Sequence, residues 1–188
     1  MDPKPDSWHR VSSSTAADCS VFKVRQDICR NEVDDRTAKF YVIEAPDWVN
    51  IIARDKQDRI IMIEQFRHGT HEVVTEIPGG IVDEGEEPLA AAKRELLEET
   101  GYIAADWKFL GRSRPNPAIQ NNWVHHFLAE GCEVAAAPAP DENESIAIKP
   151  MALSAVDELI DNGSITHSLV IAAFYYFKGY LLNENSTS

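Results

Sequence analysis

One stretch constrains the chain more than any other, GGIVDEGEEPLAAAKRELLEETGY at Gly79–Tyr102. Its first half is rich in glycine and acidic residues and predicts a turn-rich loop. Its second half predicts a helix, because Pro88 suits a first helical turn and Gly101 suits the position just past the last turn. The residues between them are strong helix formers. The stretch is therefore expected to fold as a loop that leads into a helix.

Three glutamates gather on one face of that helix. Glu95, Glu98 and Glu99 are spaced i, i+3 and i+4, which places them side by side on a helix. Ala91 sits among them and is expected to leave room for a ligand. The opposite face is apolar and consists of Leu89, Leu96 and Leu97.

This acidic face has two interpretations. Like charges at such spacing destabilise a helix by roughly 0.2–0.5 kcal/mol per pair, and a solvated acidic face is the simpler interpretation of three acids alone. A divalent cation reverses that sign, because carboxylate oxygens are ligands that Mg2+ and Mn2+ prefer. The residues around the acids decide between the two.

Composition and charge exclude several classes of protein. The chain has 188 residues, 44% of them hydrophobic, which is enough for a domain with a core. Its net charge of −13 argues against nucleic acid as a partner, because binding to the phosphate backbone needs a basic face. The longest apolar run, Leu169 to Leu182, includes Lys178 and is too short to span a bilayer. No membrane partner is therefore expected.

The cysteines and the first residues indicate a compartment. Cys19, Cys29 and Cys132 form no paired motif, so neither a disulfide framework nor a zinc site is expected. The beginning of the sequence, MDPKPDSW, is polar and unlike a secretory signal. These features predict a cytoplasmic protein.

The loop and the helix together resemble the Nudix box, G-x5-E-x7-R-E-U-x-E-E-x-G-U, where U is an aliphatic residue. Every fixed position matches, and the matching residues are Gly80, Glu86, Arg94, Glu95, Leu96, Glu98, Glu99 and Gly101. The one departure is Tyr102, where an aliphatic residue would be usual. The resemblance covers roughly Ile51 to Leu182. It implies the α/β Nudix fold, a mixed β-sheet sandwiched between α-helices.

The chain is expected to have three parts. Residues 1–45 would be an N-terminal β extension, loose as far as residue 18 and then a β-hairpin built from Ser20–Asp27 and Lys39–Ala45. Resemblance to relatives of this type implies that the extension joins two copies in a homodimer. Residues 46–182 would form the Nudix hydrolase domain, and residues 183–188 a flexible tail.

The resemblance also implies roles for the residues of the box. Glu95 and Glu99 would be direct ligands of a divalent metal, Mg2+ or alternatively Mn2+. Glu98 would bind a second ion or orient its water, and so take part in catalysis. The carbonyl oxygen of Gly79 would be a further ligand. The remaining motif residues would be structural, with Glu86 and Arg94 as an ion pair between loop and helix, and Gly80 and Gly101 at the turns.

Two residues before the box are predicted to contact substrate. Arg67 ends the segment Gln65-Phe66-Arg67, where it could form a surface salt bridge or bind a phosphate through two parallel N–H bonds. A similar Q-F-R segment in sugar-nucleotide pyrophosphatases of the family favours the phosphate. Glu76 resembles the first residue of the family's E-[IL]-P-[AG]-G lead-in. It would bind substrate ribose or a metal-bound water, or else cap backbone N–H groups of its loop.

Two further residues are assigned from weaker patterns. Pro117 lies fifteen residues after the box, a spacing that resembles the ADP-ribose branch of the family, although a loop proline without a role in recognition is the simpler interpretation. A nucleobase needs an aromatic face, for which Trp48, Phe22 and Phe66 are candidates, and each is by default a core residue. Trp48 is preferred because it is expected at a strand edge.

A second acidic segment follows an alanine- and proline-rich loop. Asp141-Glu142-Asn143-Glu144 could be an exposed loop without function, but it resembles the loop that supplies the catalytic carboxylate in ADP-ribose pyrophosphatases. By that match Glu142 would be the general base and Glu144 a further metal ligand. The exchange of these two roles stays open.

The implied reaction is Mg2+-dependent hydrolysis of a nucleoside diphosphate sugar such as ADP-ribose, giving AMP and ribose 5-phosphate. Two alternatives stay open. The first is a Nudix pyrophosphohydrolase for another nucleotide, such as a dinucleoside polyphosphate, coenzyme A or an oxidised dNTP. The second is a non-catalytic nucleotide or metal sensor, and the intact acids Glu95, Glu98 and Glu99 count against it.

Overall fold

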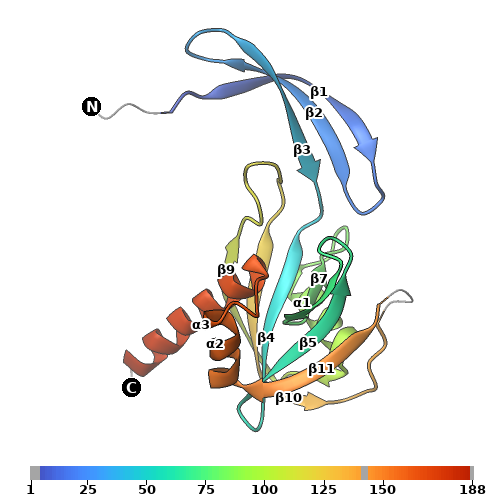
Figure 1. Cartoon of the computed structure of the whole chain (residues 1–188), viewed down its shortest axis with the longest axis vertical. Helices are drawn as coiled ribbons and strands as arrows, with labels where there is room; N and C mark the ends of the chain where they lie inside the picture. Colours follow the sequence, from blue (N-terminus) through green and yellow to red (C-terminus); the bar gives the residue numbers. More distant parts are fainter. Residues whose placement is uncertain (1–4, 141–143, 187–188) are drawn as a thin grey trace. The chain divides into compact units, whose positions relative to one another are not determined.

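A computed structural model describes residues 5–140 and 144–186 of the chain (Figure 1). The chain divides into two compact units. The first holds the chain up to Pro46 together with Arg114–Asn122, and the second holds Asp47–Ser113 together with the chain from Trp123 onward. A short segment between two strands of the second unit therefore belongs to the first.

The first unit is a three-stranded antiparallel sheet in the order β1-β2-β3. Its strands are β1 (Trp8–Asp18), β2 (Lys23–Asn31) and β3 (Thr37–Glu44). The sequence predicted a two-stranded hairpin after a loose segment, and this prediction is wrong for β1. Nearly all side chains of β1 are exposed, so no apolar alternation marks it. It is defined instead by backbone pairing with β2, from Trp8 opposite Asn31 to Asp18 opposite Lys23.

The interior of this sheet is polar. Among the described residues of the first unit, Asp27, Asn31 and Asn122 are buried, and no apolar side chain is. Asp27 accepts hydrogen bonds from the hydroxyl of Ser13 and from Nε of Arg25. The sheet therefore has hydrogen bonds and ion pairs but no hydrophobic core of its own.

The segment of residues 114–122 is tied to the end of β3. The N–H of Ile43 donates to the carbonyl of Ile119 at 2.7 Å, and the carbonyl of Ile43 accepts from the N–H of Asn121 at 3.3 Å. The N–H of Ala45 donates to the side chain of Asn121, also at 3.3 Å. Backbone bonds thus hold this segment in the first unit.

The second unit is built on a mixed sheet with the strand order β11-β5-β4-β10-β8, to which β6, β7 and β9 add as partners of β5, β4 and β10. The strands are β4 (Trp48–Asp55), β5 (Arg59–Arg67), β6 (Glu72–Glu76), β7 (Gly79–Ile81), β8 (Tyr102–Ile103), β9 (Asp106–Ser113), β10 (Val124–Val134) and β11 (Ile146–Ala152). Strands β4 and β10 run parallel, and the other pairs are antiparallel.

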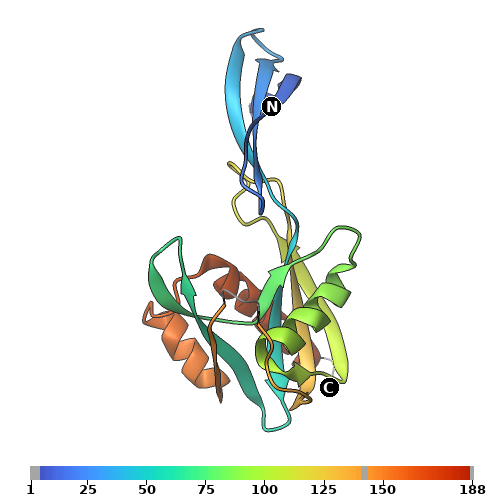
Figure 2. The ribbon, with the colours of Figure 1, turned by 90° about the vertical axis from the view of Figure 1, so that its right-hand side faces the viewer.

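Helices cover both faces of this sheet. In the described part of the chain they are α1 (Pro88–Thr100), α2 (Leu153–Asp161) and α3 (Ser168–Ser186). Helix α1 lies on one face, and α2 and α3 lie on the other (Figure 1, Figure 2). Ile51 of β4 packs in one core cluster with Leu96 of α1, while Ile52 packs in another with Phe174 of α3. Because successive strand residues point to opposite faces, β4 is buried on both sides. The α/β fold with a mixed sheet between helices is confirmed.

The ends of two helices test predictions from the sequence. Gly101 ends α1 as predicted, with a φ of 73° and its N–H bonded to the carbonyl of Leu97. Helix α3 continues to Ser186, so residues 183–186 are helical where a flexible tail was predicted. No glycine or proline follows Gly179, so nothing in the sequence stops the helix earlier. Of the described helices, none combines the length and apolar character needed to cross a membrane.

Candidate active site

Helix α1 carries three acidic side chains on one side, and two of them, Glu95 and Glu99, lie against the glycines of β7. Glu95, Glu98 and Glu99 share one side of the helix but differ in burial. Glu99 is 3% exposed, Glu95 is half-buried and Glu98 is exposed. The exposure of the three carboxyl groups therefore increases from Glu99 through Glu95 to Glu98.

The packed side of α1 is narrower than the sequence predicted. Leu96 is buried, but Leu89 and Leu97 remain exposed. Ala91 was expected to leave room for a ligand, and this is wrong, because Ala91 is fully buried in the core beside Ala92 and Leu96. Small side chains let the helix lie close to the sheet there, so Ala91 contributes to the core and not to a ligand site.

Glu99 is held by the backbone of β7. The N–H of Gly79 donates to Oε2 of Glu99 at 2.9 Å. Burial raises the pKa of Glu99 to about 8, and the charges of Glu95 and Glu144 act in the same direction, while the Gly79 N–H and Arg67 oppose it. The anionic form of Glu99 is therefore disfavoured unless a cation comes close.

Glu95 lies against Gly80. A Cβ built on Gly80 would fall 2.4 Å from Cδ of Glu95, so a larger residue at this position would force the carboxylate to move. Burial raises the pKa of Glu95, and its contact with Arg94 only partly offsets that effect. Gly79 is equally confined, since a Cβ there would lie 2.3 Å from the carbonyl oxygen of Val49.

Arg94 connects the loop to the helix and to two of the acids. Its Nε and Nη2 bind the two carboxylate oxygens of Glu86 at 3.2 and 2.9 Å, and Nη2 also donates to the carbonyl of Ile81. Its Nη1 contacts Oε1 of Glu95 at 2.8 Å and Oε2 of Glu98 at 3.1 Å. The hydrogen bond to Glu86 is the main cause of a raised pKa of Arg94. Arg94 thus stays charged and neutralises part of the acidic face.

Arg67 is paired with Glu76. Its Nε donates to Oε1 at 3.0 Å and its Nη2 to Oε2 at 2.7 Å. These are the two parallel N–H groups that the sequence assigned to a substrate phosphate. Both oxygens of Glu76 are engaged and the residue is 3% exposed, so this arrangement does not offer Glu76 to a ribose. The guanidinium nitrogen outside the pair is Nη1.

His167, which was not singled out from the sequence, lies on the other side of Glu76. Its Nδ1 is 3.6 Å from Oε1 of Glu76. Burial alone would raise the pKa of Glu76, but His167 and Arg67 outweigh it and lower that pKa to about 2. His167 is far from Glu76 in the sequence and belongs to no motif, so only the fold could reveal this contact.

Glu144, the described residue of the second acidic segment, lies near the same acids. Glu144 accepts a hydrogen bond from Nε2 of Gln65 at 3.3 Å, and its charge acts on Glu95, Glu99 and Arg67. Glu142, the predicted general base, lies outside the described residues. Gln65 is a further site residue, and the Q-F-R segment was the signal that could have found it.

The two weaker assignments, Trp48 and Pro117, stay predictions. Trp48 is half-buried in β4, with its N–H bonded to the carbonyl of Trp123 at 2.9 Å. Pro117 lies in an exposed turn of the first unit, whereas the acids belong to the second.

The donor atoms of this cluster are of the kind that binds a divalent metal, but their side chains do not yet converge on one point. In the described part of the chain, no three Asp, Glu, His or Cys side chains converge closely enough to hold an ion. The available donors are hard carboxylate oxygens, which suit Mg2+ or Mn2+. Burial raises the pKa of Glu95 and of Glu99, so a cation close to either carboxyl group would favour its charged form. The contacts of Arg94 with Glu95 and Glu98 would have to loosen for those carboxylates to turn to a metal.

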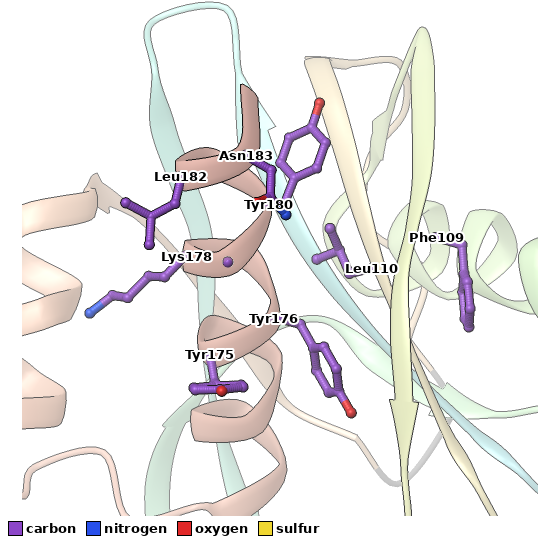
Figure 3. Close-up of a pocket in the computed structure, with 9 residues that line it drawn as sticks. Phe109, Leu110, Tyr175, Tyr176, Lys178, Tyr180, Leu182 and Asn183 are labelled. Carbon is purple, nitrogen blue, oxygen red and sulfur yellow. The ribbon is translucent and has the colours of Figure 1, made fainter. Parts of the chain in front are cut away.

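A separate cavity of about 590 Å³ lies between β9 and α3 (Figure 3). Its walls include Phe109 and Leu110 of β9 and Tyr175, Tyr176 and Tyr180 of α3. It contains none of the acidic residues of α1, so its chemistry is that of an aromatic surface rather than of a hydrolytic site.

Comparison with known proteins identifies relatives. A family model described as the NUDIX domain matches residues 46–174. The ADP-ribose pyrophosphatase of Bacillus subtilis is 30% identical over 144 residues, which cover 76% of this chain and 78% of that protein. The methanol dehydrogenase activator of Bacillus methanolicus is 28% identical over 158 residues, which cover 80% of this chain and 85% of that protein.

A solved structure described as an ADP compounds hydrolase has a TM-score of 0.83 to this chain, covers 98% of both chains and is 20% identical in sequence. At that sequence identity, the structural similarity supports the fold alone. The family model covers most of the chain, including the loop, α1 and the beginning of α3.

Proposed function

Because this chain belongs to the Nudix hydrolase family and is a pyrophosphohydrolase, we propose that it hydrolyses the pyrophosphate bond of nucleoside diphosphate sugars with Mg2+. The products would be a nucleoside monophosphate and a sugar phosphate, which for ADP-ribose are AMP and ribose 5-phosphate. The relative named ADP-ribose pyrophosphatase supports this substrate class, since the match extends over most of both proteins.

The observation that carries the proposal is the position of Glu99 at Gly79, beside Glu95. Burial disfavours the charge of both carboxyl groups. A buried carboxylate is expensive unless a proton or a cation compensates it. A divalent cation that also binds the substrate pyrophosphate would provide that compensation where the reaction takes place.

The acids of α1 would bind the metal. Glu95, Glu98 and Glu99 would hold Mg2+, with the carbonyl of Gly79 and the carboxylate of Glu144 as further oxygen donors. When bound, Mg2+ supplies charge stabilisation to phosphate oxygens and lowers the pKa of the attacking water.

Other side chains would position the reactants. Glu142 or Glu144 would accept the proton of the attacking water as general base, a role that typically contributes ~10²–10⁴-fold to the rate. Arg67 would offer the N–H groups of Nη1 to a substrate phosphate. The pair of Glu86 and Arg94 would keep the loop against α1. Trp48 and Pro117 remain proposed contacts of the nucleotide.

We also propose that the N-terminal extension, residues 1–45, makes the protein a homodimer. The apolar side chains of the first unit include Val11, Val21 and Val33, which are 56%, 61% and 73% exposed. A sheet without a hydrophobic core is marginally stable alone, and a second copy would cover these side chains. Light scattering would test this, since a monomer at micromolar concentration contradicts it. The cytoplasmic location stays a prediction, which cell fractionation would test.

A substrate panel tests the reaction. The purified protein is incubated with Mg2+ and ADP-ribose, ADP-glucose, a dinucleoside polyphosphate, coenzyme A or an oxidised dNTP, and products are separated by chromatography. AMP and ribose 5-phosphate from ADP-ribose support the proposal. If only another nucleotide is cleaved, that nucleotide replaces ADP-ribose as the proposed substrate. If none of the compounds is cleaved, the result favours a non-catalytic sensor.

Matched variants connect the activity to the acids. Glu99→Gln removes the charge of the buried acid, whereas Glu84→Gln removes a charge from the exposed part of the loop. Loss of activity in the first and not in the second is expected. Hydrolysis in water labelled with oxygen-18 identifies which phosphorus is attacked.

A further inference from the structure

The carboxylate of Glu76 is approached by a positive or polar group from two sides. Arg67 binds both of its oxygens through Nε and Nη2, and Nδ1 of His167 lies 3.6 Å from Oε1. The side chain of Glu76 is only 4% exposed. Water therefore competes little with either partner, and electrostatic contacts there are strong.

His167 approaches from a rigid element. Its carbonyl accepts the N–H groups of Val170 and Ile171, both at 3.1 Å, so it lies at the N-cap position, directly before the first residue of α3. The same turn is tied to the sheet, because Nδ2 of Asn50 donates to the carbonyl of Leu169 at 3.1 Å. The backbone of His167, from which the ring extends, is thus held in place relative to the sheet that contains β4 and β6.

The ring nitrogen that faces Glu76 has no other partner. Nδ1 of His167 is buried and makes no hydrogen bond to any residue that the structure describes. Buried polar atoms are rarely left in that state. At 3.6 Å from Oε1 of Glu76 it is slightly beyond hydrogen-bonding distance, so a small rotation of the ring completes the bond.

Arg67 is the part of this cluster that faces the acids. The negative charges that act on it are those of Glu76, Glu99 and Glu144. Its side chain is 42% exposed, whereas that of Glu76 is buried. The bidentate pair fixes the plane of the guanidinium and leaves Nη1 as the nitrogen directed away from Glu76.

We propose that His167 is a positioning residue, which acts through Glu76 to hold the guanidinium of Arg67 in the orientation that meets a substrate phosphate. This inference rests on the proposed function, since it requires a substrate that carries phosphate. His167 itself touches neither substrate nor metal. Its loss therefore weakens substrate binding more than it slows the chemical step.

Steady-state kinetics with ADP-ribose and Mg2+ test the proposal. His167→Ala is expected to raise KM about 5–10-fold with kcat changed less than about twofold. His167→Gln keeps an amide donor for Glu76 and is expected to bring KM back to within about threefold of the parent. Ser168→Ala alters the same helix start without touching Glu76 and leaves KM unchanged. An unchanged KM in H167A, a loss confined to kcat, or equal effects in H167A and H167Q would overturn it.

A double-mutant cycle asks whether His167 acts through Glu76. In a Glu76→Ala background, His167→Ala is expected to change KM by less than about twofold, because the carboxylate that links His167 to Arg67 is gone. The same 5–10-fold effect in both backgrounds would show that His167 acts by another route. Thermal melts of the four proteins establish that each is folded.

One readout is independent of turnover. Hydrogen exchange of the Arg67 Nε–H, followed by NMR, is expected to be at least about threefold faster in H167A than in the parent and in S168A, because the partner of this N–H is less firmly held. An unchanged exchange rate would refute positioning. A protein that cleaves no ADP-ribose yet shows the faster exchange would contradict the proposed function and leave the positioning of Arg67 standing.

Discussion

The carboxylate of Glu95 lies where a side chain of residue 80 would have to be. A Cβ on Gly80 would fall 2.4 Å from both Cδ and Oε1 of Glu95. The carboxylate of Glu95 on α1 therefore occupies space that is open only because residue 80 of β7 has no side chain.

Gly80→Ala is expected to displace Glu95 and to lower kcat/KM about 10–100-fold, with more Mg2+ needed for half-maximal activity. The atoms in the way are the far end of a flexible side chain, so the carboxylate can move aside and the fold is expected to be kept. Mg2+ titrations of activity, with circular dichroism to follow the fold, would measure both effects. Gly69→Ala is the control, because nothing lies within 4 Å of a Cβ at that position. Parental activity and Mg2+ requirement in G80A would contradict the proposed role of Glu95.

Binding of Mg2+ is expected to release about one proton per site near pH 7. Without metal, burial raises the pKa of Glu99 to about 8, so its carboxyl is largely protonated, and a metal ligand must be ionised. Calorimetry in buffers of different ionisation enthalpy would count the protons. Glu99→Gln should abolish the release and Glu84→Gln should not. A binding enthalpy that is the same in every buffer would refute this.

Glu86→Gln is expected to lower the free energy of unfolding by about 1 kcal/mol. The side chains of Arg94 and Glu86 are 31% and 19% exposed, and pairs that water reaches contribute less than buried ones. Arg94 would then be left to Glu95 and Glu98, so weaker Mg2+ binding should accompany the loss. Denaturant unfolding and Mg2+ titration measure the two effects, and a loss above about 3 kcal/mol would mean that the pair behaves as a buried one.

His126 makes stability depend on acidity. It is fully buried, with Nε2 2.9 Å from the hydroxyl of Ser113, and burial, reinforced by His125, lowers its pKa from 6.5 to about 4. Since the folded pKa lies below the unfolded one, the stabilisation is present above pH 6.5 and is lost as the pH falls through about 4. The loss should amount to about 3 kcal/mol.

Urea denaturation of the parent and of His126→Gln over that pH range would test this, with the exposed His9→Gln as control. The difference in free energy of unfolding between the parent and H126Q should shrink as the pH falls, since glutamine does not bind a proton in this range. A constant difference would show that His126 contributes packing alone.

Glu142→Gln is expected to reduce kcat about 10²–10⁴-fold with little change in Mg2+ affinity, as for loss of a general base. Glu144→Gln should instead raise the Mg2+ requirement. Steady-state kinetics at several Mg2+ concentrations separates the two, and unchanged turnover in E142Q would move the role of base to Glu144 or Glu98.

Local rules were sufficient for the box and its surroundings. Pro88 and Gly101 marked the ends of α1, and the spacing of Glu95, Glu98 and Glu99 placed them on one side of it. What the spacing could not predict was depth. Ala91 became core and Glu99 became buried because the sheet lies against that part of the helix, a fact of tertiary packing rather than of periodicity.

Contacts between distant segments were beyond the reach of the sequence. Arg67 was assigned to a phosphate, but its two parallel N–H groups are bound to Glu76, and His167 was not considered at all. Strand β1 was also missed, since its polar, exposed residues carry no alternation, and only its register with β2 defines it.

The attachment of Ile119 and Asn121 to Ile43 sets a condition for any shortened form of the protein. Cutting the chain at Pro46 would remove the strand end to which residues 114–122 are bonded and leave their backbone groups to solvent. A hydrolase without the N-terminal sheet would need a shorter connection between β9 and β10 in place of residues 114–122. Insertions and deletions in the two segments are thus expected to be tolerated jointly rather than singly.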